Sequence, residues 1–437
     1  MMTNTHDQAM NYVYQQVLQR LLSFFSRAER TALQLLIQRV VVAAGGMERI
    51  GEFKVLTIQS GTRDSCYTLA LLRAAQLSIA GRAPATFQLR VATLRLNGAA
   101  SSALENIHHS CSALFLYDDP RVEVLMVDNR EVLPFNHGVG VSEAGREANR
   151  LNLLMVGHRR TWNGPLDLWD DSYLATGEFY GQIARWERGV DALVSSDSQR
   201  QQRRFMEGLN RAAAKAGFPM PEQPDAGYEQ LFARLDELGS DCFREFYPGH
   251  EQPAWRPAES FEACRRATFI DIHDLLVSNL EERWPLLTEF LKFQPDGLTP
   301  QVGDNEYVSF SISAHLQGLQ ACFVQGRTYE AGISNYLQRL LVMMQRKQLP
   351  EPACDRALQA YGNPATLLDQ RELAATEAQR NLGLNEAQLV CLLFAPFVEN
   401  GASLERFLRQ CHPGMLVALP DLHRAMQGKP APEQVLQ

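Results

Sequence analysis

The sequence predicts an α+β protein that is predominantly helical, with a small core of short antiparallel strands. Two observations support this fold class. Apolar residues recur at helical spacing before residue 46 and after residue 138. Short β-branched segments separated by turn residues lie between those two regions. The chain of 437 residues is long for a single core, so several domains are expected.

The N-terminal region, residues 1–46, is predicted to form helices. A first helix is expected over residues 9–25, where apolar residues recur at helical spacing. The second begins after Ser26, whose hydroxyl can cap it in a capping box with Glu29. Gly45 and the glycine after it are expected to end this helix.

Residues 47–137 are predicted to form the α+β candidate catalytic core. Two helical segments, at 65–80 and 99–108, alternate with strands. The expected strands are FKVLTI, TFQLRVATLRL, SALFLY and VEVLMV. The last two are joined by the turn DDPR and are predicted to pair as an antiparallel ribbon.

Helical spacing returns after the core. It predicts a helical region over residues 138–297 and a C-terminal helical domain over residues 298–437. Within the first of these, a helical run over 261–293 contains Pro285, which is expected to kink or divide it.

Composition excludes several classes of function. The net charge of −8 and the pI near 5.8 argue against a nucleic-acid or anionic-membrane partner. No apolar run approaches the ~18 residues of a membrane span. The eight cysteines form no CxxC pair, and neither a metal site nor a cofactor is expected. The first residues lack a secretory signal, which predicts a cytoplasmic location or secretion without a signal peptide.

One cysteine has the setting of a nucleophile. Asp64 or Ser65 can cap a helix, which would place Cys66 in the first helical turn. Unpaired backbone N–H groups and the positive end of the helix dipole favour a thiolate there. Gln59, at the end of a predicted strand, has an amide that can donate to an oxyanion.

A base and an orienting group are predicted on the antiparallel ribbon. If its turn holds an even number of residues, His109 and Asp128 project from the same face, close enough for a hydrogen bond. An odd turn would replace His109 by His108. Two histidines in loops, His137 and His158, are further alternatives for the base.

These segments resemble known cysteine enzymes. A glutamine, a glycine-containing loop and Ser-Cys-Tyr opening a helix resemble the nucleophile segment of papain-like proteases. The continuation DSCYTLALLRAA is similar to the cysteine helix of transglutaminase-like proteins, which also carry Cys, His and Asp in this order. The resemblance covers about residues 52–135. It implies a papain/transglutaminase-like core with a triad of Cys66, His109 and Asp128.

The first functional hypothesis is therefore a thiol-dependent acyl-transfer enzyme acting on a protein or peptide amide. Water as acceptor would make it a protease or glutamine deamidase, and an amine would make it a transamidase. Large helical regions around a small core suit a protein substrate, as in a bacterial effector or toxin. The alternative is a non-catalytic helical adaptor, chaperone or scaffold in which Cys66 is a buried packing residue. The sequence does not indicate an oligomeric state.

Overall fold

The chain divides into two compact units in the computed structural model. The residues that the structure describes are 2–95, 101–128, 131–152, 186–197, 267–276, 280–294, 310–346, 351–393 and 402–421, with short pieces between 179 and 210. Unit 1 comprises Met1–Gly140, Gly181–Gln202 and Glu262–Asp296. Unit 2 comprises Val141–Tyr180, Arg203–Phe261 and Gly297–Gln437. No described helix is long and apolar enough to cross a bilayer.

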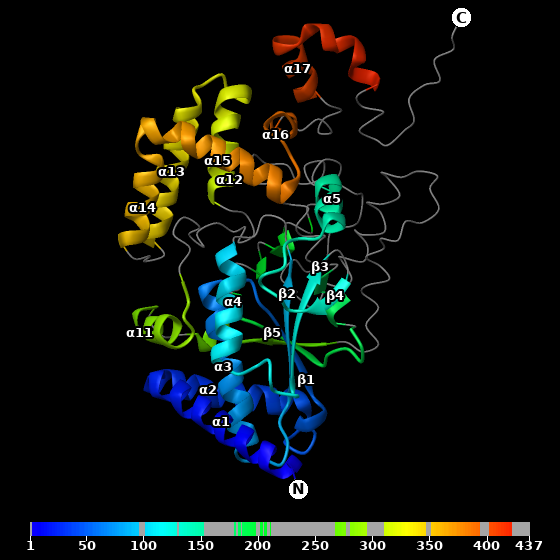
Figure 1. The fold of residues 1–437 in the computed structure, drawn as a ribbon, viewed down its shortest axis with the longest axis vertical. Coiled ribbons are helices and arrows are strands. Elements are labelled where there is room, and N and C mark those ends of the chain that lie inside the picture. The colour runs from blue at the N-terminus through cyan, green and yellow to red at the C-terminus, as the bar shows by residue number, and fades with distance from the viewer. Residues whose placement is uncertain are drawn as a thin grey trace, which may run out of the picture. The chain divides into compact units, whose positions relative to one another are not determined.

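Unit 1 is built on a six-stranded sheet (Figure 1). Its strands are β1 (Lys54–Ile58), β2 (Gln88–Leu94), β3 (Val122–Asp128), β4 (Glu131–Pro134), β5 (Ala192–Ser195) and β6 (Thr268–Asp271). The spatial order is β4-β3-β2-β1-β5-β6. All neighbouring pairs of this sheet are parallel except β3 with β4. The protein is thus mixed α/β, and the expectation of a core of antiparallel strands is wrong.

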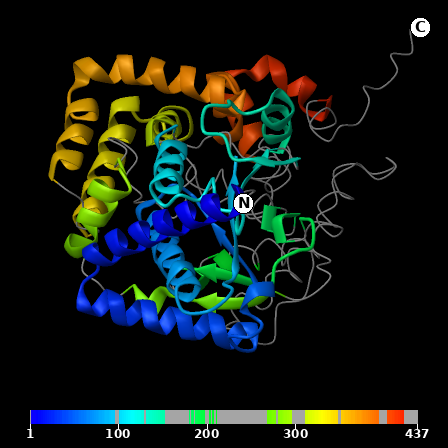
Figure 2. The ribbon, with the colours of Figure 1, turned by 60° about the horizontal axis from the view of Figure 1, so that its bottom comes forward.

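Two helices connect the first three strands. α3 (Arg63–Ala80) leads from β1 to β2, and α4 (Ser101–Ala113) leads from β2 to β3. Both connections are parallel crossovers that step across the sheet in the same direction. The usual right-handed form of such connections places their helices on one face, and α3 and α4 pack against each other. The N-terminal helices α1 (Met2–Phe24) and α2 (Arg27–Ala44) pack on α3 (Figure 2).

Local sequence signals explain the boundaries of the second helix. The Ser26 hydroxyl accepts from the Glu29 backbone N–H, and the Glu29 carboxylate accepts from the Ser26 N–H at 2.8 Å. At the other end Gly45 adopts a left-handed conformation with φ 79°, which glycine reaches without steric cost. Both predictions for this helix are confirmed.

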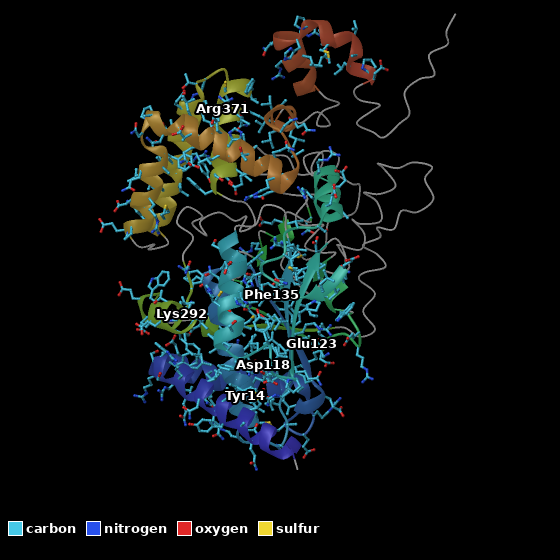
Figure 3. All side chains as sticks on the ribbon, viewed as in Figure 1. Tyr14, Asp118, Glu123, Phe135, Lys292 and Arg371 are labelled. Carbon is cyan, nitrogen blue, oxygen red and sulfur yellow. The ribbon has the colours of Figure 1, made fainter. Side chains whose placement is uncertain are left out.

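The core of unit 1 lies between the sheet and these helices. Alternate residues of the central strands, among them Val55, Leu89 and Val91, are buried together with side chains of α1 to α4. The opposite face of β2 carries Arg90, which is fully buried. Arg90 donates to the Glu123 carboxylate at 2.6 Å and to the carbonyl of Ile183 (Figure 3 labels Glu123).

Three predicted elements differ from the structure. The segment SALFLY is not a strand, because α4 continues to Ala113 and a turn follows it. Leu104, Ile107, Cys111 and Leu114 are all buried, so the helical periodicity extends further than expected. In addition, β5 and β6 lie in a region predicted to be helical. The division at Pro285 is confirmed, since α11 (Leu280–Pro285) gives way there to a π-helical turn, η6 (Leu286–Phe290).

Unit 2 is helical in its described part. Its helices are α5 (Glu143–Asn152), α12 (Phe310–Leu319), α13 (Tyr329–Arg346), α14 (Glu351–Tyr361), α15 (Pro364–Leu382), α16 (Glu386–Leu393) and α17 (Ala402–Cys411). Helix α12 is central, packing against α13, α15 and α16, and it continues into a π-helical turn, η7 (Gln320–Val324). The helical character expected for residues 298–437 is therefore confirmed where the structure describes it.

Candidate functional site at the carboxyl edge of the sheet

The four residues of the predicted catalytic set lie on four different elements of unit 1. Gln59 directly follows β1, Cys66 lies in α3, His109 lies in α4, and Asp128 is the last residue of β3. The antiparallel ribbon that was expected to carry His109 and Asp128 does not form. Instead β3 pairs with β4, and the Cα partner of Asp128 is Glu131. The alternative His158 lies outside the described residues.

Cys66 is buried in the core of unit 1. Its exposed fraction is 0%, and burial raises the pKa of its thiol to about 11, against the opposing effect of the Ser110 and Ser65 hydroxyls. The helix is capped by Thr62, so Cys66 is the fourth helical residue. Its backbone N–H already donates to the Thr62 carbonyl at 2.9 Å. Neither a thiolate at neutral pH nor a free oxyanion donor follows from this position.

His109 faces away from Cys66 on α4. The α4 residues that interact with the thiol are Ser110 and Cys111. Successive helical residues are rotated by about 100°, so His109 lies about 100° from Ser110 and about 200° from Cys111. Asp128, for its part, acts electrostatically on Arg95. The acyl-transfer role of these residues stays a prediction.

A group of polar side chains gathers instead where the parallel strands end. Gln59 continues the register of β1, since its N–H donates to the Ala92 carbonyl at 2.8 Å. Gln59 and Thr93 therefore stand side by side on the face that α3 and α4 cover. Arg95 directly follows β2, and the register of β2 with β3 places it beside Asp128 at the end of β3. We call Gln59, Thr93, Arg95 and Asp128 the carboxyl-edge cluster.

The carboxyl-edge cluster contains buried polar atoms without partners. Gln59 is only 1% exposed, yet neither its amide oxygen nor its amide nitrogen has a hydrogen bond. The Thr93 hydroxyl and the Arg95 Nε are also buried and unpaired. Burial lowers the pKa of Arg95, and the nearby Asp128 opposes this effect. Because each unpaired buried group costs about 1–3 kcal/mol, such a concentration needs a reason beyond packing.

The chain topology gives the same edge a special place. Without the hairpin strand β4, the strand order is β3-β2-β1-β5-β6. The chain moves outward from β1 to β3 and then returns to the other side of β1 at β5. In open α/β sheets, ligands bind outside the carboxyl ends of the strands at this reversal point. Gln59 lies at the reversal point, directly after β1.

The loop after β1 is held against α4. Gly61 has φ +73°, and a Cβ on it would lie 2.1 Å from the Ala103 carbonyl oxygen, so only glycine fits. The Asn106 amide donates to the Gly61 carbonyl and to that of Gln294. The space beside Gly61 is thus filled by the backbone of α4.

Comparison of the chain with protein-family models, with curated proteins and with solved structures gave no match. Among the residues that the structure describes, no group of three or more His, Cys, Asp or Glu side chains could hold a metal ion. The site must therefore be interpreted from its own geometry.

The sequence predicted the location of Gln59 correctly, but it predicted a different role for this residue. Gln59 was expected at a strand end, where it lies, but as an oxyanion donor beside Cys66. Asp128 was placed on a strand that pairs differently. Thr93 and Arg95 were missed, although polar residues that end the segment TFQLRVATLRL are a signal for the carboxyl end of a buried strand.

Proposed function

We propose that unit 1 binds a small polar ligand of the nucleoside class over the carboxyl-edge cluster. The strand order supports this, because doubly wound sheets with the order 3-2-1-4-5 bind nucleotides at the reversal point between their first and fourth strands. The choice of a nucleoside rests on this fold-level analogy. The location of the ligand rests on the side chains.

The unpaired amide of Gln59 carries the proposal. A buried glutamine can use two donors and an acceptor, which matches the edge of a nucleobase or the hydroxyls of a ribose. In the ligand-free chain these groups are unused. Because Gln59 is covered in the structure, its side chain must become accessible before a ligand can bind to it.

The loop after β1 also restricts which nucleosides can bind. Dinucleotide sites use three glycines after the first strand, and the second of them lets a pyrophosphate approach the backbone. Here the corresponding residues read Gln59, Gly61 and Asp64, and the backbone of α4 occupies the space beside Gly61. The ligand is therefore a nucleoside without a pyrophosphate at its 5′ end, such as adenosine or S-adenosylmethionine, and not a dinucleotide.

The acyl-transfer hypothesis differs from this proposal in its chemistry. It requires a reactive thiol at Cys66 and a protein or peptide substrate, and its papain-like core implies antiparallel strands where the sheet is parallel. A protein partner and a cytoplasmic location remain predictions that both hypotheses allow.

Ligand-induced stabilisation tests the proposal. Thermal unfolding of the full chain is measured alone and with adenosine, S-adenosylmethionine, NAD or ATP. A ligand at 100 times its Kd stabilises the native state by about 2.7 kcal/mol. We expect adenosine or S-adenosylmethionine to raise the Tm and NAD and ATP to leave it unchanged. If none of the four raises it, the nucleoside proposal is wrong.

Two variants connect the effect to the site. Gln59→Met removes the amide at nearly constant length, so we expect the ligand-induced shift to disappear while the free protein becomes no less stable. Thr68→Val is the matched control, because the Thr68 hydroxyl is also buried and unpaired but belongs to α3 and not to the carboxyl-edge cluster. Thr68→Val should keep the shift. A shift that survives in Gln59→Met would remove Gln59 from the site.

A further inference from the structure

Three histidine side chains gather on and beside α4. The rings of His108 and His137 are stacked, with centroids 3.9 Å apart and an interplanar angle of 22°. The ring of His109 lies 6.0 Å from that of His108. The Nδ1 of His108 is 3.1 Å from the Tyr117 hydroxyl. The sequence predicted His109 as the base, with His108 and His137 as alternatives to it.

Stacked imidazoles at this distance accommodate one proton more easily than two. The charges that act on His108 come from His109 and Glu105 on α4 and from His137 across the stack. Burial lowers the pKa of His108, His137 and His109 lower it further, and Glu105 alone opposes them. A single nearby carboxylate balances one imidazolium. A second proton would place two like charges face to face.

The stack holds a connecting segment. Phe135 is the last residue attached to the sheet, through its N–H to the Val124 carbonyl at 3.0 Å. The Asn136 side chain accepts from the Gly138 N–H in a local turn. Unit 1 ends at Gly140 in this part of the chain, and unit 2 begins at the next residue. The stack of His137 on His108 therefore attaches the segment before the junction to α4.

We propose that the His108–His137 stack is a proton-controlled latch at this junction. At neutral pH the stack holds residues 136–140 on α4. When both rings carry a proton, the repulsion between them releases the segment. The latch is independent of the ligand proposed for the carboxyl edge.

Hydrogen exchange of the full chain tests the latch. Amide protection of residues 134–142 is compared near pH 7.5 and about pH 5, after correction for intrinsic exchange. If release takes up one extra proton, protection should fall by about tenfold per pH unit wherever the released segment binds that proton and the stack does not. Unchanged protection at the lower pH would overturn the proposal.

The variants separate protonation from other effects of acid. His137→Phe keeps a flat ring on His108 but cannot take up a proton, so residues 134–142 should stay protected at both pH values. His108→Phe should behave in the same way, and it provides the same test if His137→Phe fails to fold. His273→Asn removes an exposed histidine elsewhere in unit 1 and should respond to pH as the wild type does. Loss of protection at low pH in both Phe variants would contradict the latch.

Discussion

His315 predicts a specific weakness of unit 2 toward acid. It lies in α12 with an exposed fraction of 0%, and its Nδ1 is 2.9 Å from the Tyr329 hydroxyl. Its Nε2 is 3.6 Å from a Glu386 carboxylate oxygen and has no hydrogen bond. Burial lowers the pKa of His315 to about 4, against the attraction of Glu386, while Arg371 (labelled in Figure 3) adds to the decrease. The ring is therefore neutral in the folded chain at neutral pH.

The sign and size of the effect follow from this pKa. In the unfolded chain the ring takes up a proton near the ordinary value of 6.5, whereas in the folded chain it does so only near 4. The contribution of the neutral ring is fully present above pH 6.5 and decreases as the pH falls toward 4. The difference between the two pKa values corresponds to about 3 kcal/mol of the free energy of unfolding.

The assay must report on unit 2 alone, because a protein of two units need not unfold in one step. Pulse-labelling hydrogen exchange along a urea series gives the unfolding of α12 at several pH values between neutral and about 4. His315→Asn is the reference, since it places an amide near Tyr329 but does not titrate. The wild type should lose about 3 kcal/mol more than this variant over that interval. Equal losses in the two proteins would refute the reasoning.

Three further predictions concern unit 1. Gly61→Ala should destabilise it by about 4 kcal/mol or more, because the new Cβ meets the backbone of α4. Gly326 has a similar φ but open space around it, so Gly326→Ala should cost only about 1 kcal/mol. Urea unfolding of the two variants checks this difference. Asp119→Ala leaves two guanidinium groups without their buried carboxylate and should cost about 3–5 kcal/mol by the same measurement; a loss below about 1 kcal/mol would contradict it. Iodoacetamide near neutral pH should modify the exposed Cys322 and spare Cys66 in the folded chain, as peptide mass spectrometry would show. Rapid labelling of Cys66 would instead support the acyl-transfer hypothesis.

The sequence was sufficient where the signals are local. The boundaries of α2 follow from a capping box at Ser26 and Glu29 and from the left-handed Gly45, and each of these signals lies within a few residues of the helix end that it sets. The division at Pro285 follows equally from one residue that cannot continue the backbone hydrogen bonds. The helical content of unit 2 follows from apolar periodicity over long segments.

Strand pairing was not predictable in the same way. VEVLMV was correctly recognised as a strand, but its partners are β2, which precedes it by a whole helix, and β4, the short EVLP segment that follows it. β5 and β6 have four residues each, and their apolar character continues into neighbouring helical spacing, so the pattern favoured a helix. β5 pairs with β1, which is more than 130 residues earlier, and β6 pairs in turn with β5. Tertiary contacts decided these elements.

The candidate site shows how a small error in a helix boundary changes the chemistry that is inferred. A cap at Asp64 or Ser65 would have put Cys66 in the first turn, where backbone N–H groups are free. The cap is Thr62, and Cys66 becomes the first residue of the helix whose N–H is used within it. The sulfur lies beside Ser110 in the core of unit 1, and a role of Gln59 in acyl transfer stays a prediction. The unpaired amide of Gln59 at the end of a parallel strand supports the proposed ligand site.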